Sequence, residues 1–273
     1  MTVRIVYTDL DGTMVGWRGS FFAGPDPQPT LVPAEALVEL HRGGVPLVLV
    51  SGRTRPQLLE AAALLGADGF IGELGAVLGW DRGRGGEVLR GEMPDQLPGT
   101  PVEAMDGADL AERLFAAFPG RLEWHAPWHV GHEADLMLRG NVATVEVHDW
   151  LDAAGFGWLR IHDNGVLPRR EMPSTAEPVH VYHLLPDGID KGVAVARDLD
   201  RRGIPAADAV AIGDSTSDLA MAPYVGRFFL VANGAQSPAT RAAAEALGNV
   251  TVTAGSFGLG WAEAVLAVLS EQA

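Results

Sequence analysis

Short apolar runs alternate with segments of helical periodicity over the first 80 residues. Residues 4–8 and 45–51 are rich in β-forming side chains, and the second run is almost wholly apolar, as in a parallel strand covered on both faces. Residues 33–42 carry apolar side chains at helical spacing between a proline and two glycines, and residues 56–67 repeat this pattern. The alternation predicts an α/β fold with a doubly wound parallel sheet.

The alternation of apolar runs and helical segments returns towards the C-terminus, after a stretch with a different pattern. The elements that we expect there are strands at 178–185, 209–213 and 228–233, and helices at 192–203, 218–225 and 259–270. The stretch between these two alternating parts is expected to contain helices at 108–118 and 142–154 and strand-like runs at 134–139 and 157–165. We therefore expect a core made of residues 1–82 and 179–273, with an inserted α+β domain at 83–178.

Composition narrows the classes of function. The 273 residues include 47% hydrophobic side chains and no cysteine, which excludes disulfides and thiolate metal sites and favours a reducing cytoplasm. The N-terminus shows no signal peptide, and the apolar runs are too short to cross a bilayer. The net charge of -15 argues against nucleic acid and membranes as partners, and a phosphorylated substrate would need a local counter-charge. The oligomeric state stays open between a monomer and a homodimer.

Two acids follow the first expected strand, in the segment Asp9-Leu10-Asp11-Gly12-Thr13. Ligands of open α/β sheets bind at the carboxyl ends of the strands, where these side chains would lie. One carboxylate could bind a hard cation and attack phosphorus while the other moves protons. The alternative is an ordinary turn with capping acids.

Three further segments occupy comparable positions. Ser51-Gly52-Arg53 follows the second strand and offers a hydroxyl and amides to an anion, or a plain helix cap. Lys191 begins a helix, where a cation opposes the helix dipole unless it reaches an anion. Asp214 and Asp218 follow the strand at 209–213 at a spacing that can surround one Mg²⁺, or merely cap a helix.

Taken together and in order, "DLDGT", "SGRT", "DKG" and "GDSTSDLAM" resemble the four motifs of the haloacid dehalogenase superfamily of phosphohydrolases. The insertion between the second and third motifs resembles the α/β cap of its sugar-phosphatase branch, which includes sucrose-phosphate and mannosyl-3-phosphoglycerate phosphatases and the eukaryote-type phosphomannomutases. Two positions depart from that pattern. Leu74 replaces an asparagine in the "ELGA" segment, and Ser217 stands where many relatives have asparagine.

The resemblance implies a mechanism and a cofactor. Asp9 would be the nucleophile that becomes a phospho-aspartate, and Asp11 would protonate the leaving alcohol and then deprotonate water. Lys191 would pair with Asp9 and, with Ser51, hold phosphoryl oxygens. The residues implied as further phosphate-binding groups are Gly52, Arg53 and Thr13, and those implied as Mg²⁺ ligands are Asp9, Asp11 through its carbonyl, Asp214 and Asp218.

The predicted function is that of a Mg²⁺-dependent phosphatase for a small phosphorylated metabolite, such as a phosphosugar or a glycosyl-phosphoglycerate. A phosphomannomutase-like phosphotransferase and a catalytically silent ligand-binding relative are the alternatives. A glycosidase would leave Lys191 and the Asp214/Asp218 pair without a role. His125, His129 and His132 in the inserted domain fit a second metal site, sugar recognition beside tryptophans, or ordinary packing.

Overall fold

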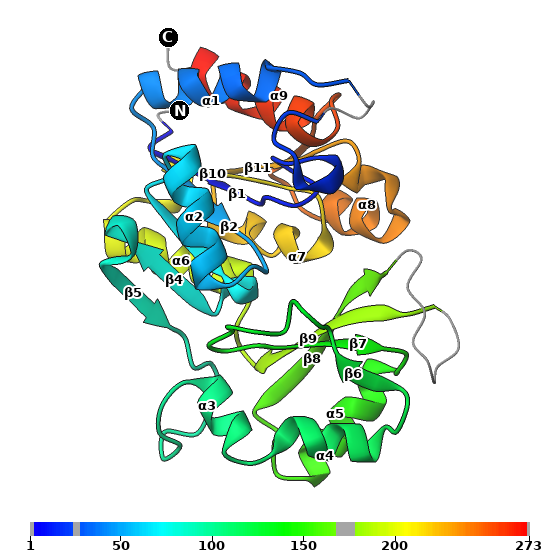
Figure 1. The fold of residues 1–273 in the computed structure, drawn as a ribbon. Helices are drawn as coiled ribbons and strands as arrows, with labels where there is room; N and C mark the ends of the chain where they lie inside the picture. The colour runs from blue at the N-terminus through cyan, green and yellow to red at the C-terminus, as the bar shows by residue number, and fades with distance from the viewer. Residues whose placement is uncertain (1–2, 24–27, 168–177, 272–273) are drawn as a thin grey trace. The chain divides into compact units, whose positions relative to one another are not determined.

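The computed structural model describes residues 3–23, 28–167 and 178–271. The chain forms two compact units, a larger one of Met1–Glu87 with Asp190–Ala273 and a smaller one of Val88–Ile189 (Figure 1). Each unit has its own sheet and its own core.

The larger unit is built on an eight-stranded sheet with the order β12-β11-β10-β1-β2-β3-β4-β5. Strands β12 to β3 are parallel, and β4 runs antiparallel to β3. The strand bounds are β1 (Ile5–Thr8), β2 (Leu47–Val50), β3 (Gly69–Gly72), β4 (Val77–Trp80), β5 (Gly85–Val88), β10 (Ala209–Gly213), β11 (Arg227–Leu230) and β12 (Val250–Val252). The central strands are buried throughout, which explains their nearly continuous apolar sequences.

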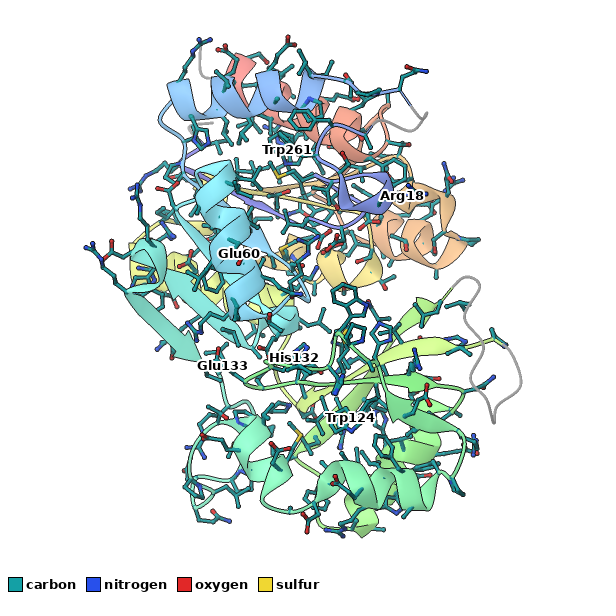
Figure 2. The ribbon with its side chains drawn as sticks, viewed as in Figure 1. Arg18, Glu60, Trp124, His132, Glu133 and Trp261 are labelled. Carbon is teal, nitrogen blue, oxygen red and sulfur yellow. The ribbon has the colours of Figure 1, made fainter. Side chains whose placement is uncertain are left out.

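Helices cover both faces of this sheet, so the predicted α/β class with a parallel-dominated sheet is confirmed. Helices α1 and α9 lie side by side over one face, and α6 and α7 lie over the other (Figure 1). Trp261 on α9 is fully buried in this core (Figure 2). The helix bounds are α1 (Val32–Arg42), α2 (Arg55–Leu65), α6 (Lys191–Arg202), α7 (Thr216–Leu219), α8 (Pro238–Glu245) and α9 (Phe257–Ser270).

The smaller unit has a four-stranded antiparallel sheet with the order β6-β7-β9-β8. Its elements are α3 (Pro101–Asp106), α4 (Leu110–Ala117), β6 (Leu122–Trp124), β7 (Leu136–Gly140), α5 (Thr144–Ala153), β8 (Leu159–Val166) and β9 (His180–Pro186). Leu136 and Leu138 alternate with less buried neighbours on β7, and they join one apolar cluster with residues of α4 and α5. The cluster gives this unit an independent core.

Two expected elements differ from the structure. The strand expected at 178–185 is β9, which pairs with β7 and β8 and therefore belongs to the smaller unit rather than to the core. The helix expected at 218–225 is divided into α7 and a short 3₁₀ turn, Ala222–Tyr224, because Pro223 cannot continue the hydrogen-bond pattern of a helix. Among the described residues, no helix combines the length and apolar character needed to span a membrane.

A single tyrosine hydroxyl joins two segments of the smaller unit. The buried Tyr182 on β9 donates to the carbonyl of Val142 at 2.9 Å and accepts from its amide at 3.1 Å. We expect Tyr182→Phe to lower the free energy of unfolding by about 1–3 kcal/mol, because two buried backbone groups lose this partner. Urea denaturation measures the change, and Tyr224→Phe, at a more exposed tyrosine of the larger unit, is the matched control. Equal stability of the two variants would contradict this role.

Candidate active site

The carboxyl end of β1 places Asp9 inside the larger unit and turns Asp11 outward. The Asp9 amide still donates to Ile212 of β10 at 2.9 Å, so Asp9 continues the strand and is only 5% exposed. The chain then turns at Gly12, whose φ is +94°. A Cβ on Gly12 would lie 2.3 Å from a carboxylate oxygen of Asp214, so both the turn and the close approach require glycine.

The carboxyl end of β10 supplies the second and third acids. Asp214 directly follows β10, and Ser215 caps helix α7. Asp218 is fully buried, and its Oδ2 accepts from the amides of Asp214 and Ser215 at 3.0 and 2.9 Å and from the Ser215 hydroxyl at 2.7 Å. These bonds fix Asp218 beneath the loop that carries Asp214.

Lys191 reaches the acids from the first turn of α6. Asp190 caps this helix by accepting from the Val193 amide at 2.7 Å. A Cβ on Gly192 would lie 2.0 Å from the Ala220 carbonyl, so this glycine permits the close approach of α6 to the segment after α7. The buried Lys191 ammonium then donates to Asp9 Oδ1 at 2.9 Å and to Asp218 Oδ1 at 2.5 Å.

Burial and mutual repulsion control the ionisation of these groups. Burial and the Asp218 carboxylate raise the pKa of Asp9 to about 7, although Lys191 acts in the opposite direction. Burial and the charges of Asp218 and Asp9 raise the pKa of Asp214 to about 8. Burial alone would lower the pKa of Lys191, but Asp218 and Asp9 outweigh it and raise that pKa above its ordinary value. The lysine is therefore a cation beside two acids, Asp9 and Asp214, whose raised pKa values oppose their ionisation.

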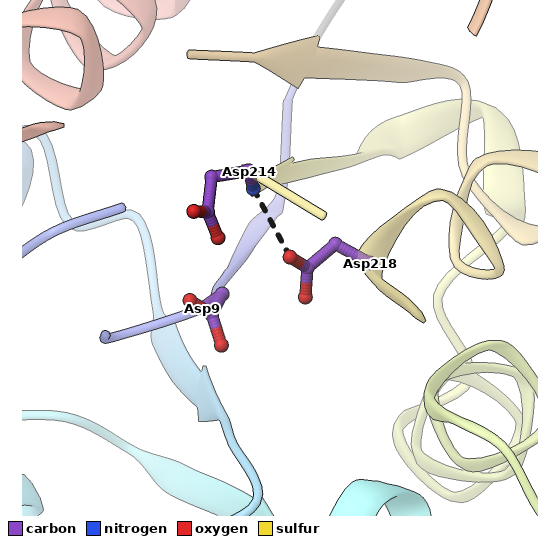
Figure 3. A group of neighbouring side chains, drawn as sticks. All are labelled: Asp9, Asp214 and Asp218. Carbon is purple, nitrogen blue, oxygen red and sulfur yellow. Dashed lines mark hydrogen bonds between the residues drawn. The ribbon is translucent and has the colours of Figure 1, made fainter. Parts of the chain in front are cut away.

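The acidic group fits a hard divalent cation. One carboxylate oxygen from each of Asp9, Asp214 and Asp218 lies within 4.8 Å of the others, and Figure 3 shows the three carboxyl groups together. Asp9 Oδ2 is buried and has no hydrogen-bond partner among the described residues. Oxygen ligands of this kind suit Mg²⁺, and a cation would offset the repulsion that raises the two pKa values.

The remaining predicted site residues lie at the ends of β1 and β2. Thr13 is buried and donates to Asp214 Oδ1 at 3.3 Å. Ser51 is also buried, and its hydroxyl accepts from the Arg53 amide at 3.3 Å across Gly52. The Arg53 guanidinium makes an ion pair with Asp11 through two hydrogen bonds, at 2.8 and 2.6 Å.

Solved structures with the same fold cover nearly the whole chain. A Thermoplasma acidophilum protein superposes with a TM-score of 0.68 at 16% identity, over 98% of this chain and 99% of that one. The sucrose-phosphatase of Synechocystis, solved with sucrose and phosphate, gives a TM-score of 0.66 at 15% identity over 98% of each chain.

Sequence comparisons add similarity to known phosphatases. A phosphoglycolate phosphatase of Methanospirillum hungatei is 28% identical over 232 residues, which cover 85% of this chain and 84% of the relative. One from Methanococcoides burtonii is 25% identical over 273 residues, which cover 99% and 98%. The model of the haloacid dehalogenase-like hydrolases matches residues 171–251, a range that contains Lys191, Asp214 and Asp218. This part of the chain is therefore similar to the haloacid dehalogenase-like hydrolases. The resemblance seen in the four motifs is confirmed at the level of this superfamily.

The sequence analysis missed one residue of the hydrolase site, Asn233. Its amide donates to the Gly12 carbonyl at 2.8 Å and to Asp214 Oδ2 at 3.4 Å, while its oxygen accepts from the Phe257 amide at 2.7 Å. Asn233 thus joins the segments that follow β1, β10 and β11. A polar residue after the apolar strand β11 was the available signal, because β10 beside it and β1 beyond that strand also end in polar residues.

The histidines of the smaller unit do not gather into a second metal group. Among the described residues, the Asp9 group alone brings three or more potential ligands within 4.8 Å of one another. His129 stacks on Trp124 with a centroid distance of 5.0 Å, and His132 lies 3.6 Å from the buried Asp135. Asp135 also contacts His183 on β9 at 2.5 Å, a pair that the sequence analysis did not anticipate.

Proton release should accompany cation binding in this hydrolase. The raised pKa values of Asp9 and Asp214 mean that the cation-free folded state binds more protons than the unfolded state between about pH 4 and 8, so this contribution to stability falls as pH rises through that range. We expect Mg²⁺ to raise the melting temperature more at pH 9 than at pH 6, where protons compete with the ion. Thermal denaturation with and without Mg²⁺ measures this, and Asp214→Asn should reduce the shift at both pH values. An equal Mg²⁺ effect at the two pH values would contradict the assignment.

Asn233 should hold in place the two turns that carry Gly12 and Asp214. We expect Asn233→Ala to weaken Mg²⁺ binding by about 10-fold or more, because side chains that orient ligands contribute that much to affinity. Titration calorimetry measures the dissociation constant. Asn249→Ala is the matched control, because the Asn249 amide also ties two backbone carbonyls, those of Ala222 and Val225, but contacts none of the three acids. Equal affinities in the two variants would remove Asn233 from the site.

Proposed function

We propose that this hydrolase is a Mg²⁺-dependent phosphatase that acts on a small phosphorylated metabolite through a phospho-aspartate formed on Asp9. The observation that carries the proposal is the Asp9 carboxylate. Its Oδ1 is held by Lys191, whereas its buried Oδ2 has no partner among the described residues. A carboxylate fixed at one oxygen and open at the other is suited to attack an electrophile.

In the first step, an oxygen of Asp9 attacks phosphorus and the bond from phosphorus to the substrate oxygen breaks. The electron pair of that bond goes to the leaving alcohol, which takes a proton from Asp11. Lys191 holds the nucleophile in position and offsets negative charge as the phosphoryl group transfers. Asp218 keeps the lysine in place, because its other oxygen is bonded to the loop after β10.

In the second step, water attacks the phosphoryl group and the bond between phosphorus and Asp9 breaks. Asp11, now ionised, accepts the proton from that water, so both residues return to their starting states. A cation would be held by Asp9, Asp214 and the carbonyl of Asp11, with Asp218 beside them. Bound Mg²⁺ would reduce the repulsion between the Asp9 carboxylate and a phosphate dianion, and would stabilise charge in the transition state.

Ser51 and Thr13 are suited to support the phosphoryl group. Both are small, buried hydroxyl residues at the ends of β2 and β1, and Thr13 contacts Asp214. The amide of Gly52 belongs to the same turn as Ser51, before the capped start of α2. Hydroxyl and amide donors at such positions bind phosphate oxygens in many α/β proteins.

The relatives indicate the chemical class of the substrate. Phosphoglycolate phosphatases are similar over most of the chain, and a sucrose-phosphatase shares the fold. We therefore propose a small phosphorylated hydroxy acid or sugar, with 2-phosphoglycolate as the first compound to assay. The glycosyl-phosphoglycerates expected from the motifs belong in the same screen.

A phosphate-release screen with Mg²⁺ tests the proposal. We expect release from at least one sugar phosphate or phospho-hydroxy acid, and a loss on the order of 10³-fold or more in kcat/KM for Asp9→Asn, because the variant lacks a nucleophilic carboxylate. Chelation of Mg²⁺ should abolish release, and readdition should restore it.

Asp200→Asn is the control, because it makes the same substitution at an exposed aspartate of α6, outside the site. Full activity of Asp9→Asn would overturn the proposal. Interconversion of sugar monophosphates without release of phosphate would replace it by a phosphotransferase, and ligand binding without turnover would replace it by a silent relative.

A further inference from the structure

The ion pair between Arg53 and Asp11 joins the turn after β1 to the turn after β2. Nε of Arg53 donates to Asp11 Oδ2 at 2.8 Å and Nη2 donates to Oδ1 at 2.6 Å, so both carboxylate oxygens are fixed by one planar group. The side chains are 33% and 54% exposed, and water therefore reaches both of them. The Arg227–Glu271 pair has a similar two-bonded geometry, so it is the place of the Arg53 pair at the ends of β1 and β2, beside the acidic group, that connects it with the site.

Arg53 is the fixed partner of the pair. Its amide donates to Ser51 Oγ at 3.3 Å, and its carbonyl accepts from the Glu73 amide at 3.1 Å. The next residue, Thr54, begins α2 with a reciprocal cap to Gln57. Arg53 therefore stands between the end of β2 and the start of a capped helix.

Asp11 is the partner that needs support. It lies in the turn between Leu10 and Gly12, outside β1, and its side chain is about half exposed, whereas Asp9 is buried. Asp11, which is proposed to act first as the acid and then as the base, must lie within hydrogen-bond distance of the leaving oxygen. An exposed aspartate in a turn samples several rotamers. A two-bonded arginine restricts that freedom.

We infer that Arg53 is a positioning residue that aims the Asp11 carboxyl group at the leaving oxygen and does not itself bind the phosphoryl group. This inference rests on the proposed function, since it assigns how the proton donor is held. The competing role is the one expected from the sequence, in which Arg53 binds phosphate directly.

The two roles predict different dependence on the leaving group. Proton donation matters for a substrate whose alcohol is a poor leaving group, but little for one that departs as a stable anion. Phenyl phosphate and p-nitrophenyl phosphate have nearly the same shape and differ in this property. The ratio of kcat/KM between them therefore reports proton donation in the step that breaks the phosphorus–oxygen bond, independently of how tightly phosphate is held.

We expect Arg53→Gln to lower kcat/KM for phenyl phosphate by about 10- to 100-fold and for p-nitrophenyl phosphate by less than about threefold. Asp11→Asn should show the same selectivity, and the double variant should be no slower than Asp11→Asn alone, because Arg53 acts through Asp11. Arg53→Lys keeps the charge but loses the planar two-bonded contact, and it should recover only part of the activity.

Arg227→Gln is the matched control. Arg227 makes a similar two-bonded pair with Glu271, at 2.8 and 2.5 Å, with comparable exposure and no contact with the acidic group. It should leave the kcat/KM ratio unchanged. Melting temperatures of all variants establish that each is folded. If Arg53→Gln does not fold, the kcat/KM ratio is measured on Arg53→Lys instead.

Equal losses for the two substrates in Arg53→Gln, with a further loss when Asp11→Asn is added, would overturn the inference and assign Arg53 to phosphate binding. In that outcome Asp9→Asn remains inactive and the phosphatase proposal stands. Failure of the proposed function looks different, because Asp9→Asn would then keep its activity. An Asp11→Asn variant without leaving-group selectivity would overturn the proton-donor role of Asp11 and, with it, this role of Arg53.

Discussion

The buried Lys191 ammonium is the interaction on which the site depends. Asp9 and Asp218 are at most 5% exposed, and both contact this one cation. An isolated carboxylate is costly to bury, and a second one beside it adds repulsion, as the raised pKa of Asp9 shows. The lysine stabilises one arrangement of these charges and leaves an oxygen of Asp9 open. Its position at the start of α6 opposes the helix dipole, and two carboxylates compensate for that cost.

The topology of the sheet assembles groups that are far apart in sequence. β1 lies between β10 and β2, and all three strands are parallel, so their carboxyl ends meet at one edge. Asp9 and Asp214 follow the paired strands β1 and β10, and Ser51 follows β2. Asn233, which lies beyond β11, then ties the turn at Gly12 to Asp214. Side chains that follow β1, β10 and β11 thus meet at one group of acids, and the close approach at Gly12 brings the turns after β1 and β10 together.

The sequence was sufficient for those parts of the molecule whose signals are local. Neighbouring residues are enough to predict the apolar strands β1 and β2, helix α1 between its proline and glycines, and helix α6. They are also enough to find acids that directly follow a strand. The place of β9 could not be predicted from neighbouring residues, because its apolar sequence suits either sheet and its pairing with β7 and β8 depends on residues distant in sequence. The same reason hid the pairs Arg53 with Asp11 and His183 with Asp135, which join residues 42 and 48 positions apart. Metal, phosphate and catalytic roles came from the family resemblance, and these assignments stay predictions.

Leu74 shows how the fold accommodates a departure from the motifs. The residue has a φ of 55°, in the left-handed region that asparagine adopts more readily than leucine, and Glu73 before it has a φ of 50°. The turn keeps this conformation although its sequence does not favour it. Gly75 supplies a reason, because a Cβ there would lie 2.3 Å from the carbonyl of Asp190, the residue that caps α6. The turn after β3 therefore packs directly against the start of the helix that carries Lys191. Strain in this turn is tolerated because relaxing it would disturb the position of the cation that the buried acids require.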